Sequence, residues 1–246
     1  MTSLTRMYIR RNLGDVLRVP ITLLSVALTP VAIMLFFFVP FIGDDSRMMT
    51  TATGTFVVFA VLLACVVHVA NTIAFQRESS WGIFQRTLPG GPVPSMVSHI
   101  VVDMIVVAIA IIPVIGVAAV FTSASAPAGR ILLAAVALLA VVITFTLLGL
   151  AIGSTMSTQA TMLVTSIGLL PLAVAGGMFF DPANTPGFIE AIAPYTPTGG
   201  ATDLVLAALL GTSLGNVSVI MLIVWTVVLA GVAVWGHRRD AMRRFQ

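Results

Sequence analysis

The sequence has little charge, one cysteine and no lysine. Only 9% of its 246 residues are charged and 59% are hydrophobic, with a mean hydropathy of +1.10. A water-soluble globule of this length could not cover so much apolar surface. The single cysteine, Cys65, lies in an apolar run and excludes a disulfide framework or a CxxC metal site. The composition therefore indicates a protein whose solvent is lipid.

The sequence also lacks the motifs of nucleotide hydrolysis and of metal-dependent peptide cleavage. The sequence contains neither the phosphate-binding loop GxxxxGK[ST] nor an HExxH helix. An intramembrane enzyme would need paired polar catalysts at depth, and the sequence places one aspartate there, Asp103. We therefore expect no catalytic residue, metal site or cofactor in this chain.

Six apolar stretches are long enough to cross the bilayer as helices. A hydrocarbon core of about 30 Å needs about 20 residues, and a helix satisfies every backbone group internally. The sequence thus predicts an all-α membrane protein with one transmembrane domain over residues 1–246. The predicted spans are residues 20–42, 52–75, 97–121, 130–153, 160–180 and 215–236.

The arginines predict the orientation of these spans. With the N-terminus inside, only Arg47 and Arg130 lie outside, and the positive-inside rule favours this topology. Both termini are then cytoplasmic. The arginines predicted to be cytoplasmic are Arg6, Arg10, Arg11, Arg18, Arg77, Arg86, Arg238, Arg239, Arg243 and Arg244.

Residues 1–19 precede the first span and have their own pattern. Apolar residues fall loosely on one helical face and arginines lie elsewhere around the helix, which is typical of an interfacial amphipathic helix. A solvated basic tail that only fixes topology is the alternative. The residues of the apolar face are Leu4, Met7, Tyr8, Leu13, Val16 and Leu17.

The longest cytoplasmic connection, residues 76–95, is predicted to hold a short helix that ends at Pro89. Trp81, Phe84 and Leu88 fall at positions i, i+3 and i+7 and form an apolar stripe. This stripe predicts docking on another protein, and lying against the membrane interface is the alternative.

Residues 181–214 contain four prolines around short apolar pieces. Thr185 and Pro186 can start one helix, as N-cap and first helical residue, and Gly211 can end a second. The second piece is too short for another crossing, so we predict a re-entrant helical hairpin at the external face. An ordinary surface loop is the alternative.

Polar residues at membrane depth are costly and can mark a functional path. His68 and Asn71 lie at i and i+3, and His99 and Asp103 lie at i and i+4, so each pair can hydrogen-bond within its own helix. We expect local bonding for His99 and Asp103, and a translocation path or proton relay is the alternative. In the fifth span, Pro171 predicts a kink.

Two segments resemble the ABC-2 type transporter permeases, the membrane subunits of ATP-driven ABC exporters. The first is GIFQRTLPGGPVPS, where Gly82, Arg86, Leu88 and Pro89 resemble the daunorubicin and multidrug-resistance branch, and the second is PLAVAGGMFFDPANTPGFIEAIAPYTP. The loop lacks the GTLE-type pattern of polysaccharide exporters. With the six spans, the resemblance extends over essentially the whole chain.

The resemblance implies a permease in the bacterial plasma membrane that exports an amphiphilic drug, lipid-like or peptide substrate. A separate ATPase subunit would bind ATP and Mg, and a second permease chain, identical or homologous, would pair through the first and fifth helices. The implied coupling residues are Arg77, Glu78, Trp81, Gly82, Phe84, Arg86, Leu88 and Pro89. The expected substrate path is lined by Phe36, Phe37, Phe38, His68, Asn71, Phe179 and Phe180.

A second function class is an ion- or proton-coupled secondary transporter in which His68 and Asp103 form the relay. Such proteins often have interruptions at matching positions of two halves. The sequence contains no matching interruption in spans one to three and four to six, which favours the permease.

Overall fold

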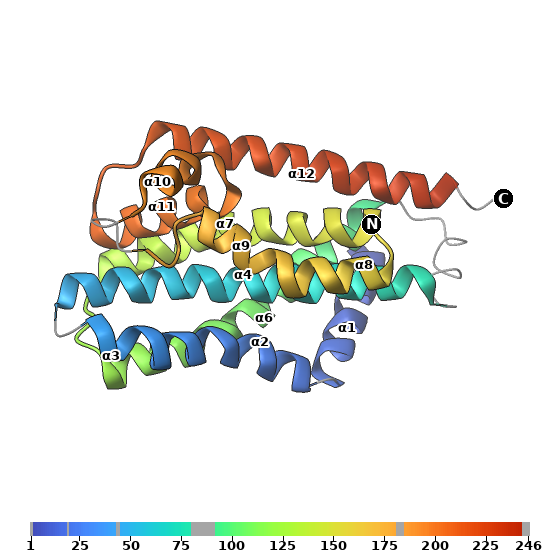
Figure 1. The fold of residues 1–246 in the computed structure, drawn as a ribbon. Coiled ribbons are helices and arrows are strands. Elements are labelled where there is room, and N and C mark those ends of the chain that lie inside the picture. The colour runs from blue at the N-terminus through green and yellow to red at the C-terminus, as the bar shows by residue number, and fades with distance from the viewer. Residues whose placement is uncertain (1, 19, 43–44, 80–91, 181–184, 243–246) are drawn as a thin grey trace.

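Long helices run side by side along one axis in the computed structural model (Figure 1). The structure describes residues 2–18, 20–42, 45–79, 92–180 and 185–242, and no strand occurs among them. The helices are α1 Thr2–Arg18, α2 Pro20–Ile33, the π turn Met34–Phe38, α3 Val39–Ile42, α4 Ser46–Glu78, α6 Pro92–Phe121, α7 Ala128–Thr155, α8 Thr158–Leu163, the π turn Val164–Gly168, α9 Leu169–Ala175, α10 Gly187–Ile192, the 3-10 turn Ala193–Tyr195, α11 Pro197–Leu210 and α12 Asn216–Met242.

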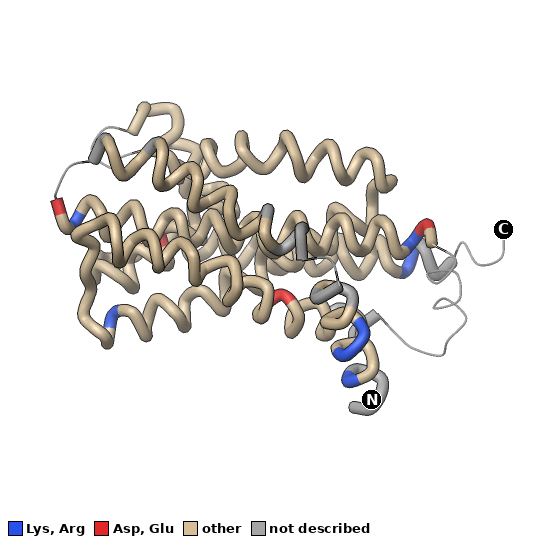
Figure 2. Tube along the Cα trace, turned by 90° about the horizontal axis from the view of Figure 1, so that it is seen from below, with Lys and Arg blue, Asp and Glu red and all other residues tan. Residues whose placement is uncertain are grey.

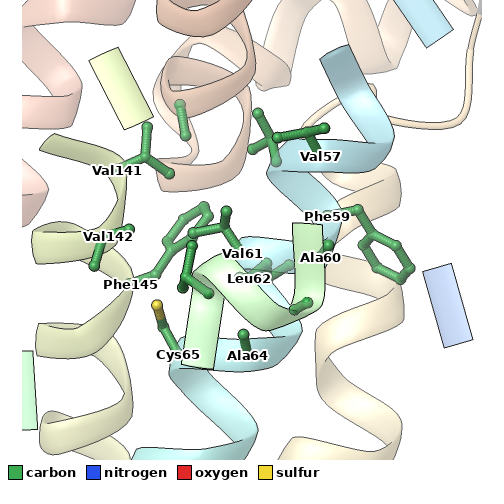
Figure 3. Packing of buried hydrophobic residues seen from close by; sticks show 14 of the residues in the cluster. Val57, Phe59, Ala60, Val61, Leu62, Ala64, Cys65, Val141, Val142 and Phe145 are labelled. Carbon is green, nitrogen blue, oxygen red and sulfur yellow. The ribbon is translucent and has the colours of Figure 1, made fainter. Parts of the chain in front are cut away.

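Helix α4 is the central helix of the bundle. In its most apolar segment 67% of the residues are buried, whereas 22% are buried in the most apolar segment of the helix over residues 158–175. α4 packs against α2, α6, α7 and α11. Figure 3 shows Val61 and Cys65 of α4 beside Phe145 of α7, and all three side chains are fully buried. The core therefore lies along α4, and the outer helices turn apolar faces outward.

Among the described residues, five helices are long and apolar enough to cross a membrane. They correspond to five of the six predicted spans, although the helix of the fifth ends at Ala175 and not at residue 180, and the first predicted span, residues 20–42, is also helical but consists of α2, a π turn and α3. The count of six crossings stays a prediction. Figure 2 shows charged residues mainly toward the two ends of the bundle, as expected when lipid surrounds its middle.

Both π turns precede a proline. Pro40 and Pro171 have no N–H for the carbonyl four residues earlier, Phe36 or Ile167, and each of these lies in the π turn. A proline ring also collides with that carbonyl, so widening the turn relieves the clash. The kink predicted at Pro171 stays a prediction; the structure has a π turn there, and helix α9 ends at Ala175, before the positive φ of Gly177.

The hairpin after residue 184 consists of two helices with an intervening 3-10 turn. Thr196 caps α11 by accepting a hydrogen bond from Gly199 N, and Gly211 ends it with φ +76° as predicted. The predicted start of α10 was displaced by one residue, because Pro186 is the N-cap and the helix begins at Gly187. The first residues of α11 are buried against the bundle, so this segment is not an ordinary surface loop.

Helix α1 lies crosswise to the long helices and packs on α6 (Figure 1). Asn12 Nδ2 donates to Ser98 Oγ at 3.0 Å, and Val16 is buried in the core. Within the predicted apolar face, Met7 is half exposed, while Ile9, which that face omitted, packs against the core. The N-terminal segment is therefore a packed helix rather than a solvated tail.

Candidate functional site

The last residues of α4 lead directly into the predicted coupling loop. Arg77 and Glu78 are described, and they end the helix before Ser79. The other six predicted coupling residues lie outside the described residues. These are Trp81, Gly82, Phe84, Arg86, Leu88 and Pro89.

Arg77 and Glu78 contact the turn between α7 and α8. Arg77 Nη1 donates to Gly153 O and to Met156 O, both at 2.9 Å. Glu78 Oε1 accepts from Thr158 N at 3.1 Å. The cation thus lies on carbonyls at the C-terminus of α7 and the anion on an amide at the N-terminus of α8, which is the favourable arrangement for both helix dipoles.

A buried polar cluster joins α4, α6 and α7. His68 Nδ1 lies 2.9 Å from Asp103 Oδ1, and Thr146 Oγ1 donates to Asp103 Oδ2 at 2.8 Å. Asp103 and Thr146 are fully buried, and His68 is 9% exposed. Hydrogen bonds to both carboxylate oxygens compensate the cost of burying Asp103.

The expectation that His99 and Asp103 bond locally is wrong. Asp103 points away from its own helix toward α4 and α7, and His99 Nδ1 has no hydrogen-bond partner in the described part of the chain. Asn71 also bonds elsewhere than His68, since its Nδ2 donates to Val67 O at 2.9 Å and to Thr165 Oγ1 at 3.4 Å. For Asp103 the cause is that tertiary packing brings partners from two other helices, whereas Asn71 makes its shorter bond to the preceding turn of its own helix.

Asn71, Thr158, Thr161 and Thr165 form a polar seam between α4 and the helix that begins with α8. The three threonines fall at i, i+3 and i+7 and share the face toward α4. Asn71 Oδ1, Thr158 Oγ1 and Thr161 Oγ1 are buried and have no partner among the described residues. This contact is therefore incompletely satisfied, which lowers its contribution to stability.

Two of the predicted path phenylalanines belong to an aromatic cluster. Phe38 and Phe56 have ring centroids 4.7 Å apart, and Phe179 lies 5.2 Å from Phe59, all in edge-to-face geometry. Of the remaining three, Phe36 is 69% exposed and Phe180 is half-buried, and the side chain of Phe37 lies outside the described ones.

Residues 211–215, GTSLG, match the GxSxG pattern of a hydrolase nucleophile. That pattern requires a sharp turn from a strand into a helix. Here Gly211 ends α11, and Ser213 lies in an exposed connection to α12. The segment therefore lacks the geometry of a nucleophile elbow.

A family model described as ABC-2 family transporter protein matches residues 43–235, while a comparison with curated proteins gives no match. The chain belongs to the ABC-2 transporter family. It is a multi-pass membrane protein and a permease subunit of an ABC transporter, and permeases of this family typically work with an ABC ATPase.

Sequence reasoning missed several residues of these sites in the ABC-2 permease. Thr146, Phe56 and Phe59 received no role, although each contacts a residue that did. A threonine in a span usually bonds the carbonyl of its own preceding turn, as Thr144 does, so nothing in the sequence distinguishes Thr146.

Proposed function

We propose that this permease moves an amphiphilic drug, lipid-like or peptide substrate out of the cytoplasm, with energy from a separate ATPase subunit. The observation that carries the proposal is the family match over residues 43–235, which includes the loop 76–95 and the hairpin 181–214. The apolar stripe that the spacing of Trp81, Phe84 and Leu88 predicts supports docking of that loop on the ATPase.

The aromatic cluster supports the choice of an amphiphilic substrate. Phe38, Phe56, Phe59 and Phe179 form a continuous set of edge-to-face contacts. Aromatic and aliphatic surface binds amphiphiles with few charged contacts. His68 and Asn71, further along α4, would supply polar contacts to this path.

Copurification tests the proposed function. The tagged permease is purified from native membranes, and copurifying proteins are identified by mass spectrometry and assayed for ATPase activity. We expect a stoichiometric ABC ATPase that is lost when Trp81 and Phe84 are both changed to Asp. Recovery of the permease alone, without ATPase activity, would contradict the proposal.

A proton-coupled secondary transporter is the second candidate, and one observation favours it. His68 and Asp103, distant in sequence, form a buried pair with 2.9 Å between Nδ1 and Oδ1, which is the geometry that a proton relay needs. This candidate predicts that transport continues without the ATPase and stops when the proton gradient is collapsed.

A further inference from the structure

Two adjacent residues cap two successive helices at one end of the bundle. Arg77 bonds the carbonyls of Gly153 and Met156, and Glu78 accepts from the Thr158 amide. Gly153 is in the last turn of α7, whose final carbonyls have no partner within the helix, and Thr158 is the first residue of α8. Arg77 therefore lies at the C-terminus of α7, and the next residue, Glu78, lies at the N-terminus of α8, so each charge is favourable for the dipole of the helix it contacts.

The turn that receives these contacts is short. Met156 is the C-cap of α7 and Ser157 is the N-cap of α8, with its side chain accepting from Ala160 N. Only two residues connect the helices, so this turn is too short to absorb a displacement of its residues. Movement at the end of α4 is thus passed to the beginning of α8.

On the α7 side, the contact with α4 is rigid. A Cβ at Gly153 would lie 2.5 Å from Ala70 O, and one at Gly149 would lie 3.1 Å from Cys65 O, so the two backbones touch along this stretch. Small residues that let helix backbones approach closely are typical of stable contacts in membranes. α4 and α7 therefore behave as one body at this end.

We infer that Arg77 and Glu78 are positioning residues that transmit movement of the loop after α4 to the α7–α8 turn, and so to α8. They do this within the chain, instead of serving as docking groups for the ATPase. The inference rests on the proposed function for the origin of the movement. The three hydrogen bonds of Arg77 and Glu78 to the α7–α8 turn, which we call the brace, lie within the permease alone.

A charge swap provides the sharpest test. The double variant Arg77→Glu and Glu78→Arg keeps the net charge and the arginine count at this end, yet puts each charge on the wrong helix end. Glu78→Gln keeps an acceptor for the Thr158 amide but loses the negative charge, so its effect should be much smaller than that of the swap. Arg239→Ala is the matched control, because Arg239 lies on α12 with its guanidinium 5.5 Å from the Trp235 ring centroid.

The readout that does not depend on the ATPase is a distance. In a Cys65→Ala background, spin labels at Phe75→Cys on α4 and Met162→Cys on α8 occupy side chains that are 67% and 51% exposed. In the purified permease, we expect one narrow distance distribution for the braced protein and a broadened one for the swap. An unchanged distribution in the swap would overturn the inference.

The ATPase complex gives the second readout. We expect the swap to retain the ATPase subunit while substrate-stimulated ATPase activity and transport fall by about tenfold, the effect of losing charge-assisted hydrogen bonds. Loss of the ATPase with an unchanged distance would assign Arg77 and Glu78 to docking and overturn the inference. If no ATPase copurifies with the wild type, the proposed function fails, and the distance in the permease alone still tests the brace. If the swap does not fold, Glu78→Arg alone tests the α8 contact, because Glu78 is exposed.

Discussion

Helix α4 makes two very different contacts with the two halves of the α7–α8 hairpin. Toward α7 the contact is close: Cys65, Val66, Val69 and Ala70 are fully buried and meet glycines of α7. Toward α8 it meets the polar seam, where three buried oxygen atoms lack partners within the described residues.

The difference indicates which helix of the pair moves. Close backbone packing has one geometry, and small displacements lose many contacts at once. A seam of hydroxyl and amide groups with unused bonding capacity can exchange partners at little cost. The π turn at Val164–Gly168 contains Thr165 of this seam, and π turns often occur at functional sites in helices. We therefore expect α7 to move with α4 as one body, and α8 to shift along the seam when Arg77 and Glu78 displace the α7–α8 turn.

The largest effect should come from breaking the α4–α7 contact. Gly153→Leu puts a Cβ 2.5 Å from Ala70 O and 3.0 Å from Ala70 Cα, and backbone cannot be displaced without separating the helices. We expect destabilisation by about 3 kcal/mol, seen as a lower thermal midpoint in detergent and loss of the monodisperse peak in size-exclusion chromatography. Gly116→Leu in α6 is the control, because no atom lies within 4 Å of its Cβ position; equal losses in both variants would refute the close-packing argument.

An intermediate effect should come from the cluster that joins α4 and α7 to α6. Asp103→Ala leaves His68 and Thr146 without their partner, and we expect a loss of about 2 kcal/mol in stability, since each unsatisfied buried group costs about 1–3 kcal/mol less any relaxation. Asp103→Asn retains hydrogen bonding at both oxygen positions and should cost much less. Thermal unfolding compares the two variants.

Transport by the Asp103→Asn variant distinguishes the two proposed functions. If the cluster only holds helices together, Asp103→Asn transports at a normal rate at every pH. A proton relay needs an ionisable group at this position, so a loss of transport in a stable Asp103→Asn protein would favour the secondary transporter.

The elements were largely predictable because their signals are local. Long apolar runs define the helices, Gly211 specifies a left-handed C-cap, and Pro171 marks a break in the fifth predicted span. What the sequence leaves open at Pro171 is the kind of break, because a kink and a π turn both relieve the same clash. The start of α10 at Gly187 differs by one residue for the similar reason that Pro fits both N-cap and N1.

The sites were less predictable because their partners come from distant segments. His68 and Asp103 are 35 positions apart, and their bond depends on how α4 and α6 are rotated about their axes, which local periodicity does not fix. Arg77 and Glu78 were assigned to the coupling loop from their position, but their contacts with α7 and α8 follow from the tertiary packing of three helices. A hydrophobic pattern reports which face is buried and not which neighbour buries it.

The smallest expected effect tests the polar seam. Two matched substitutions there should change the stability of the protein in opposite directions. Thr161 and Thr165 lie one turn apart and are both buried, but Thr161 Oγ1 has no partner among the described residues, whereas Thr165 Oγ1 accepts from Asn71 Nδ2 at 3.4 Å. Valine has nearly the same shape as threonine without the hydroxyl. Thr161→Val should therefore raise stability by about 1 kcal/mol, and Thr165→Val should lower it by about 1 kcal/mol. Thermal midpoints in one detergent measure both; a loss of stability in Thr161→Val would mean that its hydroxyl is satisfied in the folded protein, and the contrast between the two faces of α4 would then lose its physical basis.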